Sequence, residues 1–223
     1  MTHDGRAERT PQQERSIRTR SRILECAATL FDRHGYPMTT VGDIAKEAEV
    51  TRGALYYHFR DKQAVAAAIF EEQFEGMSVP PQHLRVQELV DATYLLVYGL
   101  RINPIQRGAA RLTMEQGTDR VDRTRVMQMW IDFVVSILSE AQKQGEVRPE
   151  VDVNRASRYF VAAFAGVQNM SQAFTKRHDL DEYLTDMWQY TLPAIVSDGV
   201  MAKLMLDPER GAQLARHGMA LAS

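Results

Sequence analysis

Apolar residues recur three and four positions apart along most of the chain, which is the spacing of amphipathic helices. Few segments alternate as a strand would, so the pattern predicts an all-α protein. Gly35 is expected to end the first helix, and Gly218 to close a last short helix that opens at Asp207-Pro208. The other expected helices span residues 16–34, 62–74, 84–100, 104–115, 124–144, 154–174 and 180–192.

Residues 38–62 depart from this pattern, because they predict two short helices around a tight turn. Thr40 can cap the first helix, with Asp43 three residues later as its capping partner. Val50 is expected to be buried at the turn, and Thr51 can cap the second helix. Together these signals indicate a helix-turn-helix.

The second helix of this pair carries the side chains expected to meet DNA. Arg52, Tyr56, Tyr57 and His58 can each reach phosphates or base edges, and Gly53 lets the backbone approach another surface closely. Arg is able to pair with guanine in the major groove, whereas Tyr56 and His58 are better suited to phosphate contacts or packing. A basic and aromatic helix that opens on a threonine cap suits a major groove.

Proline and glycine divide the chain into segments. Residues 1–14 are interpreted as a flexible arm, residues 15–75 as the DNA-binding domain with a connecting helix, and residues 76–223 as a larger helical domain. The boundary is set at the break before Pro80-Pro81, which cannot continue a helix. The larger domain is expected to bind a ligand and to form a dimer.

Overall charge does not suggest DNA binding, since 27 basic residues face 29 acidic ones. The local exception is a run of four arginines within residues 15–22, from which Arg18 and Arg20 are able to reach the DNA backbone or a minor groove. A solvated helix face is an equally good interpretation of these arginines.

Several classes of protein are excluded by what the sequence lacks. The single Cys26 rules out an internal disulfide, no signal peptide is visible, and no apolar run nears 18 residues, so a cytoplasmic protein without a membrane span is expected. The six histidines show no metal-ligand spacing, and there is no phosphate loop or nucleophile elbow. We therefore expect no metal, no cofactor, no catalytic residue and no enzymatic activity.

The helix-turn-helix closely resembles that of the TetR family of bacterial repressors. The matching residues are Thr40, Ile44, Ala45, Ala48, Val50, Thr51, Gly53, Leu55, Tyr56, His58, Phe59 and Lys62. The resemblance implies that Lys62 contacts phosphate and that Phe59 packs inside the unit. Glu49 departs from it, since the family commonly has Gly there, and a left-handed Glu costs about 1–2 kcal/mol.

Within that family, the rest of the chain resembles the γ-butyrolactone receptors of antibiotic-producing bacteria. The matching segments are residues 17–20, 84–91, 111–116, Trp130, 164–168 and 192–195. The resemblance implies a pocket in which a small diffusible lactone binds and releases the repressor from its operator. Trp130 matches the pocket tryptophan, and its flat face suits a lactone ring and an acyl tail. A plain core aromatic is the alternative.

One pocket residue differs from the receptors, which usually carry Thr where this chain has Ala163. An inducer other than the standard lactone is therefore open, such as a butenolide, a furan carboxylate or an antibiotic. The other residues expected at the ligand are Tyr94, Met114, Gln116, Val134, Phe160, Phe164 and Gln168. Tyr94, Gln116 and Gln168 could supply polar contacts there, and a satisfied structural residue is an equally good interpretation of each. Two alternatives remain: a pseudo-receptor for an antibiotic or pathway product, and a constitutive DNA-binding regulator without a ligand.

Dimerisation is a functional requirement of this hypothesis. A two-fold dimer places two recognition helices one DNA turn apart, about 34–36 Å, and so reads a pseudo-palindrome in double-stranded operator DNA. The helix at 154–174 includes a run from Tyr159 to Val167 without a charge, and a helix that is apolar nearly all round is buried on most sides. This helix and the next, 180–192, are the expected homodimer surface.

Overall fold

A computed structural model of the chain describes residues 10–75, 79–115 and 122–221, with side chains up to residue 216 apart from Glu75. The described residues are helical apart from loops and an isolated antiparallel bridge between Val147 and Val196. The elements are α1 (Pro11–Met38), α2 (Val41–Glu47), α3 (Arg52–His58), α4 (Lys62–Glu75), α5 (Arg85–Ile102), α6 (Pro104–Met114), α7 (Arg123–Lys143), α8 (Val153–Thr175), α9 (Leu180–Thr191), the 3₁₀ turns η1 (Leu192–Ala194) and η2 (Met201–Lys203), and α10 (Arg210–Leu221). The all-α prediction is confirmed.

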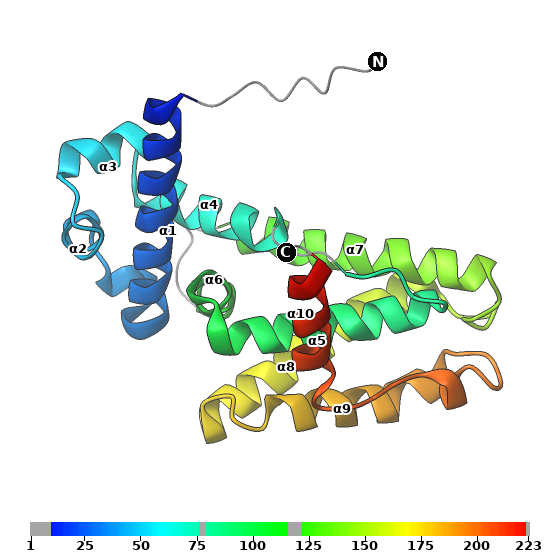
Figure 1. Cartoon of the computed structure of the whole chain (residues 1–223). Helices are drawn as coiled ribbons and strands as arrows, with labels where there is room; N and C mark the ends of the chain where they lie inside the picture. Colours follow the sequence, from blue (N-terminus) through cyan, green and yellow to red (C-terminus); the bar gives the residue numbers. More distant parts are fainter. Residues whose placement is uncertain (1–9, 76–78, 116–121, 222–223) are drawn as a thin grey trace, which may run out of the picture.

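The helices form two parts. We call α1–α4 the N-terminal unit and α5–α10 the body (Figure 1). In Figure 1, α2 and α3 lie on the outer side of α1, and α4 leads from them toward α7 of the body. The unit and the body share a core, because Ile105, Ala109 and Leu112 of α6 pack into the apolar cluster of the N-terminal unit. A body helix is thus part of the core that holds the unit together.

The first helix begins earlier than its sequence pattern suggested. Thr10 accepts a hydrogen bond from the backbone of Gln13, the Gln13 side chain accepts one from Thr10, and Pro11 occupies the first turn. This capping box starts α1 at Pro11, five residues before the expected start. Residues 1–9 of the predicted arm lie outside the described residues. Gly35 breaks the helix as expected, with φ of 78°.

The turn between α2 and α3 keeps a left-handed residue at Glu49, where the resemblance left open a strained residue or a relaxed turn. Glu49 has φ of 52°, in the left-handed region where a residue with a Cβ is strained. Its carboxylate pairs with Arg22 of α1. The turn geometry is therefore kept without glycine.

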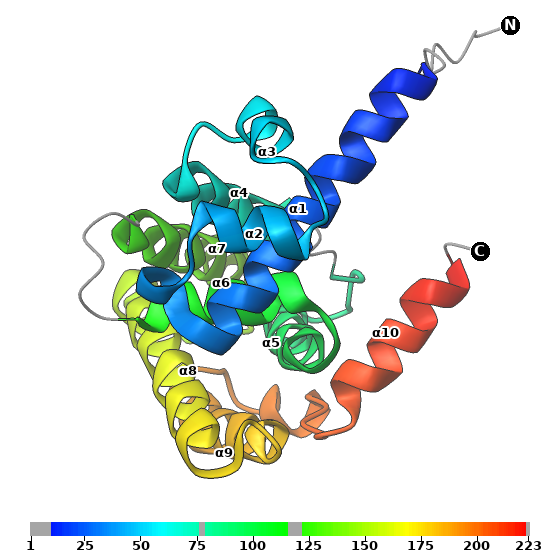
Figure 2. The ribbon, with the colours of Figure 1, turned by 90° about the vertical axis from the view of Figure 1, so that its left-hand side faces the viewer.

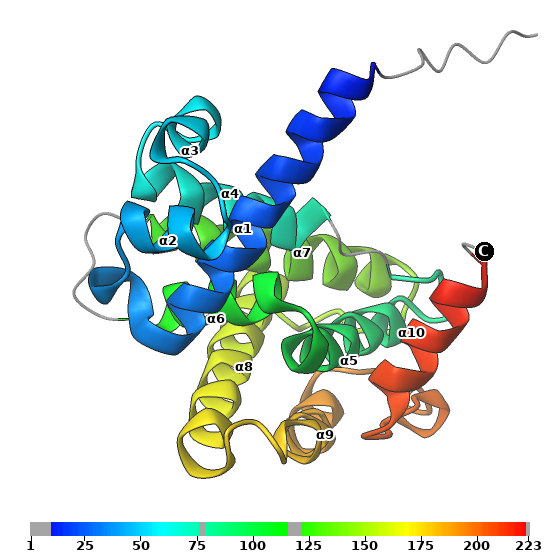
Figure 3. The same cartoon turned by 60° about the vertical axis from the view of Figure 1, so that its left-hand side comes forward.

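The body stacks its helices in layers around a second core. Figure 2 shows α8 and α9 running together at the end of the molecule opposite α3. Figure 3 shows α10 beside α5, where Arg210 of α10 pairs with the fully buried Asp91. Gly218 was expected to end this last helix, but α10 continues to Leu221. Among the described residues, no helix has the length and apolar character required to cross a membrane.

Candidate nucleic-acid interface and ligand pocket

The two short helices are capped as predicted. Thr40 Oγ1 accepts a hydrogen bond from Asp43 N at 3.1 Å, and Asp43 Oδ2 accepts one from Thr40 N at 2.9 Å. Thr51 Oγ1 accepts a bond from Ala54 N at 3.1 Å. The bonds from Thr40 lower the pKa of Asp43, so this carboxylate is ionised at the positive end of α2. The caps fix where α2 and α3 start.

The outer face of α3 presents polar and aromatic side chains to solvent. Tyr57 is 81 % exposed and Tyr56 is 53 % exposed. Arg52 lies against α2, since a methyl group on Gly42 would lie 2.7 Å from Arg52 Nη2. Gly53 is exposed, and a methyl group there would meet only Thr51 Oγ1 at 3.9 Å. The predicted contact residues of α3 therefore lie on an accessible face.

The imidazole of His58 is electrically neutral near pH 7. Burial lowers its pKa, and the nearby Arg20 lowers it further. A neutral imidazole still offers one donor and one acceptor, so His58 is able to hydrogen-bond to DNA without adding charge.

Two predicted DNA contacts are engaged inside the protein. Lys62 Nζ donates to the carbonyls of Tyr36 and Thr39, both at 2.7 Å, and lies 4.2 Å from the Tyr36 ring centroid. Arg20 lies over the Phe59 ring and pairs with Glu72 at 3.7 Å. In this structure Lys62 and Arg20 hold α4 and α1 together, and their contacts with DNA stay a prediction. Arg18 is exposed and pairs with Glu14 at 3.1 Å.

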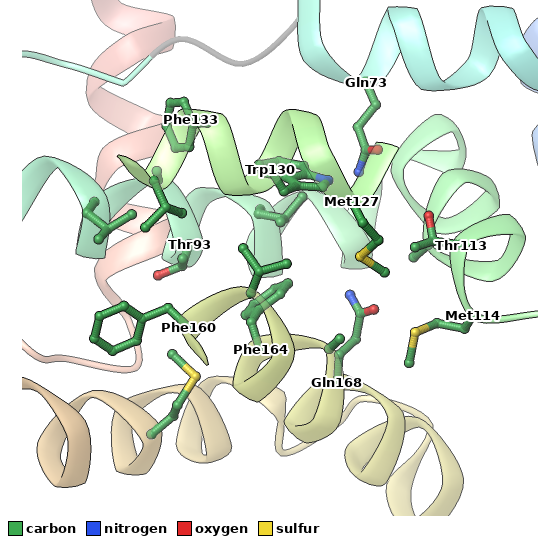
Figure 4. A pocket seen from close by; sticks show the side chains of 18 of the residues that line it. Gln73, Thr93, Thr113, Met114, Met127, Trp130, Phe133, Phe160, Phe164 and Gln168 are labelled. Atoms are coloured by element: carbon green, nitrogen blue, oxygen red, sulfur yellow. The ribbon is translucent and has the colours of Figure 1, made fainter. Parts of the chain in front are cut away.

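The body and α4 surround a narrow, partly open apolar cavity of about 80 Å³ (Figure 4). It lies among helices α4–α9. The lining residues are Gln73, Leu89, Ala92, Thr93, Leu96, Ala110, Thr113, Met114, Met127, Trp130, Phe133, Val134, Phe160, Val161, Phe164, Ala165, Gln168, Met187 and Trp188. An apolar wall with few polar groups is typical of small-molecule sites.

Six of the nine residues expected at the ligand line this cavity: Met114, Trp130, Val134, Phe160, Phe164 and Gln168. Tyr94 does not line it, because its ring is fully buried and its hydroxyl bonds with Thr185 Oγ1 at 2.7 Å. Ala163 is also absent from the lining and packs against the body core instead. These two expectations are corrected, and Gln116 lies outside the described residues.

Besides the indole N–H of Trp130, the unpaired polar groups of the described cavity wall are the amides of Gln73 and Gln168. Both are 7 % exposed, and neither amide has a hydrogen-bond partner among the described residues. The hydroxyls of Thr93 and Thr113 are satisfied, since they donate to Val90 O and Ala109 O. Sequence reasoning missed Gln73, although it follows Val65 and Ile69 at steps of four on the buried face of α4.

The cavity wall touches the N-terminal unit through α4 and α6. Trp130 packs on Phe74 of α4 with ring centroids 4.5 Å apart. Glu115, which follows the cavity residue Met114, accepts a hydrogen bond from Tyr36 N at 2.8 Å. The helices that line the cavity therefore also position α1 and α4.

Comparison with known proteins agrees with this geometry. Residues 23–69 match the family described as bacterial regulatory proteins, tetR family, and residues 85–197 match the tetracyclin repressor-like C-terminal domain. The chain is 34 % identical to the A-factor receptor protein of Streptomyces griseus over 92 % of this chain and 72 % of that protein.

Two solved structures are also similar. The full-length TetR regulator TylP from Streptomyces fradiae is 35 % identical, covers 92 % of this chain and 99 % of its own, and has a TM-score of 0.86. A γ-butyrolactone receptor described as ArpA-like is 26 % identical, covers 91 % and 99 % of the two chains, and has a TM-score of 0.66. This chain belongs to the TetR family of bacterial regulatory proteins.

Proposed function

We propose that this chain is a homodimeric repressor that leaves a pseudo-palindromic operator when a small diffusible signal of the γ-butyrolactone, butenolide or furan type binds its body. As a TetR-family protein similar to γ-butyrolactone receptors, it is a DNA-binding regulator and not an enzyme. The genes that it controls are proposed to be antibiotic or secondary-metabolite genes.

The shared helices are the observation that carries this proposal. Gln73 of α4 and Met114 of α6 line the cavity, while the same two helices pack against α1. A ligand that moves α4 or α6 therefore changes the tilt of α3 in each subunit. Couplings between two such sites are typically about 1–3 kcal/mol, which weakens DNA binding about 5–150-fold.

The width of the cavity gives a reason for such movement. A cavity of about 80 Å³ is well below the roughly 300–1,000 Å³ of ordinary small-molecule sites. Met114, Met127 and Met187 in the wall have flexible side chains that can make room. A bound ligand then favours a conformation in which the helices around the cavity lie farther apart. This displacement of the helices reaches the N-terminal unit through Glu115 and through the Phe74–Trp130 contact.

The proposed dimer surface is the outer face of α8 and α9. Large apolar side chains are exposed along it: Tyr159 at 57 %, Phe174 at 74 % and Tyr190 at 82 %. Between them, Ala162 and Gly166 are small exposed residues at helical spacing, and they permit close approach of a second helix. Exposed aromatic residues gathered on one face commonly mark an interface.

A gel shift tests the proposal, with the DNA upstream of the chain's own gene as the probe. We expect the protein to retard this fragment and an organic extract of the producing culture to release it. The Tyr57→Ala variant is the matched control, because an 81 % exposed side chain can be removed without unfolding the protein while the DNA complex is lost. Operator affinity that stays unchanged at saturating extract contradicts release by a ligand.

The narrow cavity also favours a second candidate, a constitutive regulator in which this space is only part of the core. The two candidates differ in thermal melting. A ligand-responsive protein melts at a higher temperature with its inducer, whereas a constitutive regulator melts at one temperature with every extract fraction.

A further inference from the structure

The wall of the cavity combines apolar surface with two unpaired amides. Among the lining residues that the structure describes, none is Asp, Glu, Lys, Arg or His. Gln73 and Gln168 are each more than nine-tenths buried and make no hydrogen bond with another described residue. Their amide atoms are not among the fully buried polar atoms without a partner, so both amides reach the open space of the cavity and are available to a ligand.

We propose that Gln73 and Gln168 form a polar clamp for an uncharged ligand, and that the inducer is a neutral lactone or butenolide with an oxygen function for each amide. The inference rests on the proposed function, and it excludes a furan carboxylate as the inducer. In this proposal, the two amides take the place of the threonine hydroxyl that the receptors usually carry and that Ala163 lacks.

The placement of the two side chains supports a clamp. Gln73 reaches the cavity from α4 and Gln168 from α8, and Figure 4 shows their amide groups pointing toward each other across the space beside Met127. Each amide offers an oxygen acceptor and two N–H donors. A molecule that carries a hydroxyl and a carbonyl is able to bond to both sides, while its apolar part contacts Trp130 and Phe164.

The uncharged character follows from the cost of burying a charge. A carboxylate moved from water into an apolar site is strongly unfavourable unless a cation or several donors compensate it. The described wall supplies the amide N–H groups of Gln73 and Gln168, the indole N–H of Trp130 and no cation. A neutral ester or hydroxyl loses far less hydration and is matched by the same amides.

The clamp also gives the ligand a direct contact with the N-terminal unit. Gln73 lies on α4, three residues after Phe70 and one before Phe74, both of which belong to or pack against the core of that unit. A ligand bonded to both amides therefore ties α4 to α8. The position of α4, and with it that of α3, then depends on the ligand's length.

The test compares four proteins: wild type, Gln73→Met, Gln168→Met, and the control Gln128→Met. Gln128 is an exposed glutamine of α7 whose amide donates to Asp132 at 2.7 Å. Methionine keeps the length of the side chain and removes its hydrogen bonds. Each protein is titrated calorimetrically at pH 8 with three probes: a synthetic γ-butyrolactone with an alkanoyl chain, an alkylbutenolide and an alkyl furan carboxylate. Melting of each free protein is recorded beside the titrations.

We expect at least one neutral probe to bind wild type and Gln128→Met with equal affinity. The same probe should bind Gln73→Met and Gln168→Met about tenfold more weakly, because each of these variants lacks one hydrogen bond to the ligand. We expect the furan carboxylate to bind at least tenfold more weakly than that probe. The free cavity variants should melt no lower than wild type. Equal binding by the cavity variants, tighter binding of the carboxylate, or lower melting of the cavity variants overturns the clamp.

Failure of the clamp and failure of the proposed function give different results. If a neutral probe binds all four proteins alike, only the clamp is wrong. If wild type binds none of the probes but culture extract still releases DNA, the ligand class is wrong and ligand release stands. If wild type binds none of the probes and the culture extract does not release operator DNA, the proposed function itself fails.

Discussion

The carboxylate of Glu115 accepts a hydrogen bond from the backbone N–H of Tyr36 at 2.8 Å, across 79 positions of sequence. Tyr36 follows the break in α1 at Gly35, and its carbonyl in turn accepts a bond from Lys62 of α4. One cavity helix, α6, is therefore connected to both α1 and α4 at the point where the chain turns toward α2. We regard this bond as a mechanical link between the cavity and α3.

The Glu115→Ala variant should weaken this link. It removes a half-buried hydrogen bond, which should cost about 1 kcal/mol of the free energy of unfolding. It should also raise the amount of culture extract needed to release operator DNA. Glu115→Gln keeps an oxygen acceptor and should stay close to wild type. Urea unfolding and gel shifts measure the two effects. If Gln is as damaging as Ala, the charge facing Arg111, 3.9 Å away, matters more than the bond.

Gly108 should not tolerate a side chain. A methyl group there would lie 2.7 Å from Cα, Cβ and the carbonyl oxygen of Ala28, so α1 and α6 would have to separate. We expect Gly108→Ala to lower the free energy of unfolding by about 1–3 kcal/mol, the usual effect of overpacking. Urea unfolding measures it. A variant as stable as wild type would show that α1 and α6 can separate at Gly108 without loss of stability.

Gly53 should behave in the opposite way, which makes it the matched control for Gly108. A methyl group on this exposed residue meets only Thr51 Oγ1 at 3.9 Å, so Gly53→Ala should stabilise α3 by about 0.5–1 kcal/mol. It should nevertheless weaken operator binding in a gel shift, if the backbone at Gly53 approaches DNA closely. Higher stability together with unchanged operator affinity would remove Gly53 from the interface.

Local signals were sufficient to predict the helix-turn-helix. Thr40 and Thr51 cap their helices because each threonine bonds to a backbone N–H three residues away. Gly35 breaks α1, and Glu49 takes the left-handed conformation, because both effects depend on the backbone at one position. Trp130 and Phe164 line the cavity because each lies on an apolar helix face toward the centre of the body.

Spacing along the chain could not reveal hydrogen-bond partners that lie far away in sequence. Lys62 bonds to carbonyls 26 and 23 residues earlier, and Tyr94 meets Thr185 across 91 residues. Spacing within one helix cannot show which of two buried polar residues has a partner elsewhere. For that reason Tyr94 was placed at the ligand, and the unpaired Gln73 was not.

The last prediction concerns the buried ion pair that fixes α10 to α5. Asp91 is fully buried, and Arg210 donates to both of its oxygens, from Nε at 2.9 Å and from Nη2 at 2.8 Å. The hydrogen bonds with Asp91 raise the pKa of Arg210, so its guanidinium stays charged. Leu89 and Thr93, which flank Asp91 on α5, line the cavity. The pair therefore supports the wall of the cavity from behind.

The Arg210→Met variant leaves the Asp91 carboxylate buried with Gln87 as its remaining side-chain donor among the described residues, since Gln87 Nε2 donates to Asp91 Oδ1 at 2.7 Å. Breaking a buried pair from one side costs about 3–5 kcal/mol, whereas replacing both partners by apolar residues is often neutral. We therefore expect Arg210→Met to unfold at much lower urea concentration, and Asp91→Leu with Arg210→Met to recover most of the loss. A double variant as unstable as the single one would show that α10 is held by the geometry of the ion pair and not merely by removal of an uncompensated charge.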